Sequence, residues 1–92
     1  MLRLPEVQNI NGTHCRLIKR TEKVALLSVD NGRRFEVCRI YIMPKVIVDN
    51  YIYYQREVVS SNGQFGKDGS KFFMREVDAL SYFEKLENSL NQ

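Results

Sequence analysis

The stretch that decides the fold is KVALLSVDNGRRFEVCRIYIM, residues 23–43. Two runs rich in β-branched and other apolar residues flank Asp30-Asn31-Gly32, and an Asn-Gly pair between such runs is a strong signal for a β-hairpin. Pro44 ends the second run because proline cannot donate a hydrogen bond to a sheet. The sequence therefore predicts an antiparallel hairpin near the centre of the chain.

Two registers of this hairpin compete. A loop of residues 31–32 would place Val29 opposite Arg34, whereas a loop of residues 30–32 would place Val29 opposite Arg33. The longer loop gathers five apolar residues on one face, so burial favours it. That face would consist of Ala25, Leu27, Val29, Phe35 and Val37. The opposite face is apolar too, so we expect a helix, the N-terminal arm or a partner to cover it; it would hold Val24, Leu26, Cys38, Ile40 and Ile42.

The segments on either side of the hairpin also read as strands. Residues 1–13 are expected to form an irregular arm, and residues 14–20 a first strand. Lys45–Val48 and Tyr51–Val59 are interpreted as two further strands around Asp49-Asn50, with a single bent strand as the alternative. A polar, glycine-containing loop follows over residues 60–70, and then a short strand over residues 71–74.

The apolar period becomes helical from about residue 76 to residue 90, where leucine and phenylalanine recur every three or four positions. We expect Asp78 to cap this helix and Leu80, Phe83, Leu86 and Leu90 to dock on the sheet. The fold class is therefore α+β: an antiparallel meander of four to five strands over residues 14–75, with one C-terminal amphipathic helix packed on it. The length of 92 residues is that of a single small domain.

Composition and charge narrow the range of possible functions. The formal net charge is +3; residues 14–45 carry eight Lys or Arg against three acids, and the helical segment is acidic. Two cysteines and one histidine exclude a conventional structural zinc site. The first residues lack the apolar run of an export signal, and no run is long enough to span a membrane. We expect a cytoplasmic protein with reduced cysteines and no membrane association.

Catalysis is not indicated. His14 and Cys15 are neighbours on a predicted strand, so their side chains point to opposite faces and cannot form a nucleophile–base pair. His14 with Cys38 stays open as a cross-strand combination. Because no catalytic constellation is recognisable, we expect a non-enzyme with no cofactor and no small-molecule substrate.

One loop resembles a known nucleic-acid clamp. Phe65-Gly66-Lys67-Asp68-Gly69-Ser70-Lys71-Phe72 is similar to the GxxG loop of KH domains, and the resemblance implies phosphate contact by the loop backbone. A KH loop joins two helices, whereas the preceding YIYYQREVV predicts a strand. The sequence therefore favours a strand-to-strand connection.

The sequence supports two functional hypotheses. The first is an interaction module that binds a protein partner, or itself, through an exposed sheet edge or an apolar sheet face. The second is a nucleic-acid-binding protein that uses a basic strand surface, with tyrosines that could stack on bases. The candidate contact residues are Arg16, Arg20, Arg33, Arg34, Arg39, Tyr51, Tyr53, Arg56 and Lys67.

Overall fold

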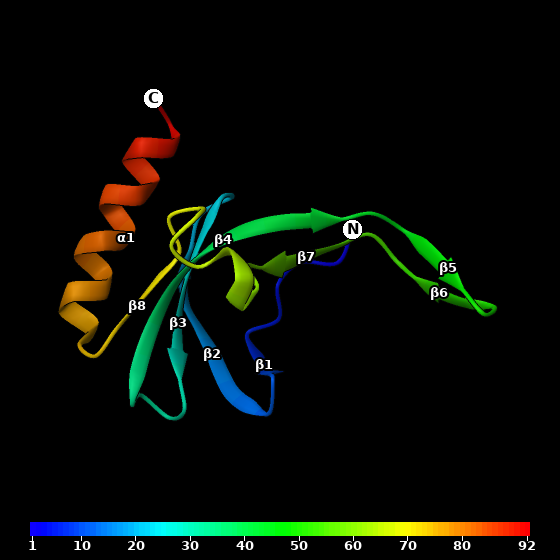
Figure 1. Ribbon diagram of the computed structural model, residues 1–92, viewed down its shortest axis with the longest axis horizontal. Helices are drawn as coiled ribbons and strands as arrows, with labels where there is room; N and C mark the ends of the chain where they lie inside the picture. The colour runs from blue at the N-terminus through cyan, green and yellow to red at the C-terminus, as the bar shows by residue number, and fades with distance from the viewer.

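The computed structural model describes residues 1–92, apart from the side chain of Asn62. An antiparallel sheet curls into a half-barrel, with one helix on its convex side and a two-stranded hairpin that projects away from the body (Figure 1). The elements are β1 (Val7–Ile10), β2 (Thr13–Arg20), β3 (Val24–Val29), β4 (Arg34–Met43), β5 (Val46–Val48), β6 (Tyr51–Tyr53), β7 (Arg56–Val59), the short 3₁₀ helix η1 (Asn62–Gln64), β8 (Lys71–Phe73) and α1 (Glu76–Leu90).

The main sheet runs in the order β1-β2-β3-β4-β7, and β8 also pairs with β4. β3 lies along one edge of β4, while β8 and β7 take successive parts of its other edge. The ten-residue β4 is therefore the central strand. The α+β class expected from the sequence is confirmed.

The register of the β3–β4 hairpin is not the one that the sequence favours. Val29 lies opposite Arg34 and Leu27 opposite Glu36, so the three-residue loop is wrong. Asp30, Asn31 and Gly32 all have positive φ, and the Arg33 N–H donates to the Val29 carbonyl at 3.1 Å and to the Asp30 carbonyl at 3.3 Å, so a left-handed turn closes the hairpin. Burial could not choose between the registers because both faces of this hairpin are covered.

Two apolar cores lie on opposite sides of the hairpin, and both combine residues that the sequence analysis had separated. The first core joins Ala25, Leu27 and Val29 to Cys38 and Cys15, and the N-terminal Leu4 packs against it. The second core lies under the helix and consists of Val24, Leu26, Val37, Ala79, Phe83 and Leu86. The helix and the N-terminal segment thus cover the two apolar faces, as the sequence led us to expect.

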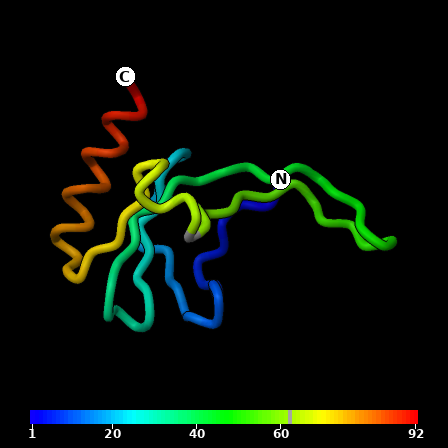
Figure 2. Tube along the Cα trace, in the orientation of Figure 1, coloured from blue at the N-terminus to red at the C-terminus, as the bar shows by residue number. Residues whose placement is uncertain are grey.

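The N-terminal thirteen residues are not an irregular arm throughout. Val7–Ile10 forms β1, which pairs with β2 through a two-residue turn at Asn11-Gly12, where both residues have positive φ. Before β1, the Leu2 N–H donates to the Gln55 carbonyl, and the Glu57 N–H donates to the Leu2 carbonyl. The N-terminal segment therefore runs beside β7 (Figure 2) and helps to close the half-barrel.

A β-bulge in β2 decides which basic side chain points inward. Leu17 pairs with Leu27 but Lys19 pairs with Leu26, so Ile18 is an extra residue without a cross-strand partner. Simple alternation along β2 would place the Arg20 side chain on the opposite face of the sheet from the Leu17 side chain. Because of the bulge, Arg20 instead lies on the face of the first core, and Lys19 lies on the helix side.

The helix occupies the expected range, but its N-terminus differs from the prediction. Arg75 is the N-cap residue, and no side chain in the described part of the chain caps the helix. Asp78 lies inside the first turn, where its charge still suits the helix dipole. The helix packs on β3, β4 and β8, with Ala79, Phe83 and Leu86 buried.

Candidate functional site: an apolar hairpin arm

The β5–β6 hairpin stands apart from the body and is called the arm below (Figure 1). Val46 pairs with Tyr53 and Val48 with Tyr51, around a two-residue turn at Asp49-Asn50. Both turn residues have positive φ, which asparagine and aspartate tolerate better than other non-glycine residues. The predicted break between two strands at Asp49-Asn50 is confirmed, but a single strand over Tyr51–Val59 is wrong, because this stretch forms β6 and β7, which pair with different strands.

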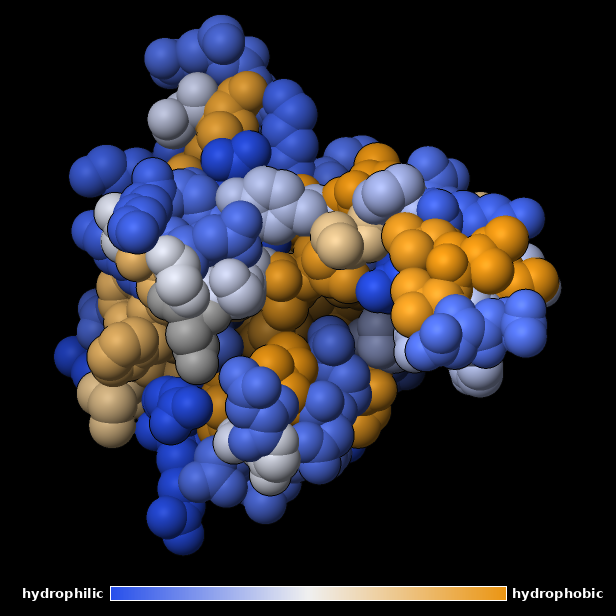
Figure 3. All heavy atoms as spheres, turned by 45° about the vertical axis from the view of Figure 1, so that its right-hand side comes forward, coloured by the Kyte–Doolittle hydropathy of each residue, from blue (hydrophilic) through white to orange (hydrophobic). Residues whose placement is uncertain are grey.

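Nearly every side chain of the arm is apolar or aromatic and exposed. Ile47 is 64% exposed and Tyr51 is 65% exposed, and the apolar side chains gather on the arm in the space-filling view (Figure 3). The exposed set continues into the end of β4 and comprises Ile42, Met43, Val46, Ile47, Val48, Tyr51, Ile52, Tyr53 and Tyr54. A contiguous apolar surface of this kind is typical of an interaction site.

The arm has little to hold it in place within one chain. A two-stranded hairpin is marginally stable in water, and β5 and β6 pair only with each other among the described strands. The Tyr51 and Tyr53 rings lie with their centroids 4.9 Å apart, and the Arg56 guanidinium lies 5.8 Å from the Tyr53 ring centroid. These contacts order the aromatic side chains but leave both faces of the arm open.

Three of the residues predicted to contact a partner belong to this region. Tyr51 and Tyr53 lie on one face of β6, and Arg56 lies at the base of the arm. The predicted contact residues do not include the neighbouring Val46, Ile47 and Tyr54. The signal was present in VIVDNYIYY, where an apolar run without polar alternation surrounds a two-residue turn.

The predicted basic residues at the β3–β4 end lie on different surfaces. Arg16 pairs with Ser28 on the helix side of the sheet, whereas Arg34 pairs with Val29 on the opposite side. Arg33 is in the turn, where it lies 3.6 Å from Asp30, and Arg34 lies 3.7 Å from Glu36. The sheet therefore separates Arg16 from Arg34.

The remaining three predicted residues lie elsewhere again. Arg20 faces inward and is held by Glu57, and Arg39 donates to the Asp68 carbonyl. Lys67 is exposed in the loop between β7 and β8. That loop joins two strands, as expected, rather than the two helices of a KH clamp. The nucleic-acid hypothesis stays a prediction.

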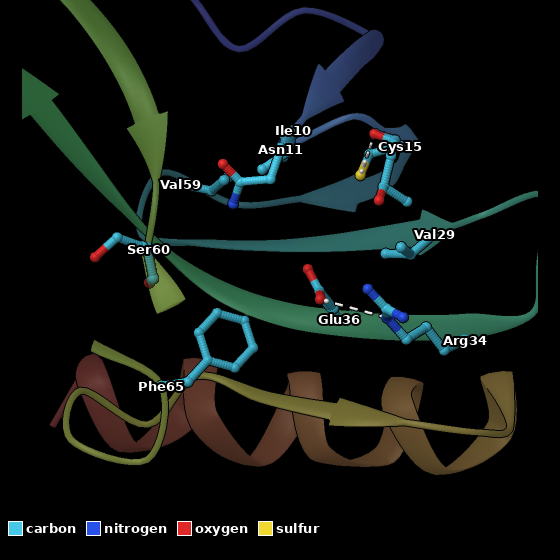
Figure 4. Close-up of a pocket in the computed structure, with 11 residues that line it drawn as sticks. Ile10, Asn11, Cys15, Val29, Arg34, Glu36, Val59, Ser60 and Phe65 are labelled. Atoms are coloured by element: carbon cyan, nitrogen blue, oxygen red, sulfur yellow. Dashed lines mark hydrogen bonds and ion pairs between the residues drawn. The ribbon is translucent and has the colours of Figure 1, made fainter. Parts of the chain in front are cut away.

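A small cavity lies inside the half-barrel, between β2, β4 and the residue 60–70 loop (Figure 4). Its volume is about 100 Å³, well below the several hundred Å³ of a typical ligand pocket. Glu36 and Arg34 line it from β4, and Phe65 faces them from the loop. Burial raises the pKa of Glu36, although Arg34 opposes this shift.

The cysteines do not form a reactive site with the histidine. Cys15 and Cys38 are free, buried thiols, and burial is the main reason that both have raised pKa values. A raised pKa makes a thiol a poor nucleophile at neutral pH. β3 lies between β2 and β4, and His14 is exposed whereas Cys38 is buried, so the two side chains do not meet across the strands.

The loop after β7 is anchored by a network of hydrogen bonds around Asp68. Its carboxylate accepts from the Tyr41 hydroxyl at 2.6 Å, the Ser60 hydroxyl at 2.8 Å and the Ser70 N–H at 2.9 Å. Burial works to raise the pKa of Asp68, but these hydrogen bonds outweigh it and lower the pKa. The network fixes the loop against β4, so a structural role accounts for these polar groups.

Glu57 is the most deeply buried carboxylate of the fold, and it ties three segments together. Arg20 donates to its two oxygens at 2.6 and 2.8 Å, and the Leu4 N–H donates to Oε1 at 3.0 Å. Its side chain is 2% exposed, and that of Arg20 is 20% exposed. The hydrogen bonds from Arg20 are the main reason that the pKa of Glu57 falls to about 2.

The lowered pKa of Glu57 predicts a loss of stability in acid. Because its pKa is lower in the folded chain, its contribution is complete above its unfolded pKa and is lost as the pH falls from about 4.5 to about 2. We expect the free energy of unfolding to fall by about 2–3 kcal/mol from this group. Urea denaturation at several pH values measures the loss. A Glu57→Gln variant should show a shallower pH dependence over the same range, and equal slopes would contradict the assignment.

Comparisons with known proteins give no further guide to the site. No family model matches the chain, and no curated protein or solved structure was found to be similar. In the part of the chain that the structure describes, no helix is long and apolar enough to cross a membrane. Within the same residues, no group of three or more His, Cys, Asp or Glu is placed to hold a metal ion.

Proposed function

We propose that this chain is a non-enzymatic interaction module whose arm docks on protein. The observation that carries the proposal is the arm itself, because its two strands present six large apolar side chains to solvent on an element with almost no support from the body. Burying such a surface is a main driving force of protein association. Docking would also order a hairpin that is marginal on its own.

The chemistry of the arm fits protein better than nucleic acid. Valine, isoleucine and tyrosine dominate its two strands, while Lys45 and Arg56 lie only at its base. Nucleic-acid binding depends on lysine and arginine that neutralise phosphates. Tyrosine is enriched in protein interfaces, where it combines a large contact area with one polar group.

Site-specific photo-crosslinking tests the proposal. Benzoylphenylalanine replaces Tyr51 at the tip of the arm in one variant and Glu84, exposed on α1, in the matched control. Both are expressed in the cells that naturally produce the protein, irradiated, and analysed by mass spectrometry. We expect protein adducts at position 51 in clear excess over position 84, because only the arm is buried against a partner.

Two results would contradict this proposal. Equal adduct yields at the two positions would mean that the arm is no more an interface than the outer face of the helix. Adducts at position 51 that contain nucleic acid instead of protein would favour the alternative hypothesis of a nucleic-acid-binding protein.

A further inference from the structure

The outer edge of β5 is an open strand edge. β5 pairs with β6 on one side, and the described residues include no strand on its other side. Folded proteins usually protect such edges, because unpaired N–H and C=O groups can pair with another chain. Here the edge is short: Pro44 limits it at one end, and the Asp49-Asn50 turn limits it at the other.

The hairpin geometry determines which backbone groups point outward. In a hairpin with a two-residue loop, the residues that flank the loop exchange hydrogen bonds with each other. Val48 and Tyr51 are those residues, and Val46 and Tyr53 form the next hydrogen-bonded pair. The N–H and C=O of Ile47, which lies between Val46 and Val48, therefore face the open edge.

The side chains along this edge are complementary to themselves. Residues 45–49 read Lys-Val-Ile-Val-Asp, with a cation at one end, an anion at the other and Ile47 at the centre. If two copies meet antiparallel about Ile47, Val46 lies opposite Val48, and Lys45 lies opposite Asp49 at both ends. Lys45 and Asp49 are both exposed and form no ion pair within the described side chains.

We infer that the partner of the arm is a second copy of this chain, joined to it through β5 in an antiparallel, two-fold symmetric pair. The two Ile47 residues exchange backbone hydrogen bonds, and two Lys45–Asp49 ion pairs fix the register. The result is a continuous four-stranded sheet in the order β6-β5-β5-β6. This inference rests on the proposed function, because it names the occupant of the same surface.

The β5 edge suits a second copy better than the β6 edge does. A two-fold interface requires one patch to be complementary to itself, and residues 45–49 satisfy this in their charges and in the apolar pairing of Val46 with Val48. Two-fold pairing about Ile52 in β6 would place Asn50 opposite Tyr54, with no charged residue to set the register. The shared sheet also gives each marginal hairpin the additional strands that it needs for stability.

Charge reversal with rescue by mixing tests the inference. Sedimentation velocity over a concentration series measures the monomer–dimer equilibrium of the unchanged chain, of Lys45→Asp and of Asp49→Lys. In each single variant, positions 45 and 49 carry like charges and lie opposite each other in the dimer, so we expect dimerisation to weaken about tenfold or more. Lys67→Asp and Glu84→Lys are the matched controls, because they make the same kind of charge change at exposed positions outside the arm.

An equimolar mixture of the two single variants provides the decisive measurement. In the mixed pair, one copy is acidic at both positions 45 and 49 and the other copy is basic at both, so the heterodimer should form where neither variant dimerises alone. The double variant with both changes should dimerise like the unchanged chain. This rescue also shows that Asp49→Lys has not simply disrupted its turn, where φ is +49°.

Other outcomes would overturn the inference. A chain that stays monomeric at every concentration, or a dimer equally insensitive to Lys45→Asp and Lys67→Asp, would exclude β5 pairing. A monomer whose position 51 nevertheless crosslinks to a different protein would refute self-pairing and leave the proposed function standing. If position 51 crosslinks no more than position 84, even to a second copy, both the self-pairing and the proposed function would be refuted.

Discussion

Replacing Glu57 by Gln should lower the free energy of unfolding at neutral pH by about 3 kcal/mol. The change leaves the Arg20 guanidinium largely buried without its counter-charge, and it turns one acceptor oxygen into an amide donor that faces another donor. The Leu4 N–H also loses part of its anchor, so the N-terminal segment should loosen. Urea denaturation measures the stability, and hydrogen exchange at Leu4 measures the local effect.

Glu22→Gln is the matched control for this prediction. Glu22 receives hydrogen bonds from Arg3, but its side chain is 75% exposed, so solvent screens the interaction and the same chemical change should cost far less stability. If the two variants lose equal stability, burial does not strengthen the Arg20–Glu57 interaction. Replacing both partners, as in Glu57→Met with Arg20→Met, should recover much of the loss because no buried charge is left unpaired.

Phe83→Ala should destabilise the chain by roughly 3–5 kcal/mol. Phe83 is 2% exposed at the centre of the second core, where it packs between the helix and strands β3 and β4. A helix of fifteen residues is marginal without such packing, so the loss should include helical content as well as stability. Thermal and urea unfolding followed by circular dichroism measures both.

Val77→Ala on the same helix serves as the comparison. Val77 is exposed, so its truncation removes little buried surface and should change stability by less than about 0.5 kcal/mol. A Phe83→Ala variant that is as stable as Val77→Ala would rule out the docking of α1 on the sheet.

The sequence predicts those elements whose residues satisfy one local rule, and it fails where two rules compete. The helix follows from the spacing of its apolar residues, and the central hairpin from Asn31-Gly32. The hairpin register was predicted wrongly because apolar residues lie on both faces, so burial carried no information and turn geometry decided. The same Asn-Gly rule at Asn11-Gly12 would have predicted β1, but it was interpreted there as a simple break.

The candidate site was only partly predictable for a different reason. An apolar, β-branched run normally indicates a buried strand, so the apolar run in VIVDNYIYY marks an unusual hairpin but does not by itself say that the hairpin is exposed. The tyrosines of the arm were selected because tyrosine is common in interfaces, and its valines and isoleucines were not. Arg20 was selected for its charge, since neither the bulge at Ile18 nor the distant Glu57 can be read from local spacing.

The bulge at Ile18 has a consequence for how the gene of this protein can change in length. Ile18 is the one residue of β2 without a cross-strand partner, so losing its codon would leave Leu17, Lys19 and Arg20 on their present faces. Loss of a codon elsewhere in the strand would reverse the residues on one side of the gap and move Arg20 away from Glu57. Position 18 is therefore the place in β2 where a deletion keeps every internal partner, at the expense of the local twist that curls the sheet.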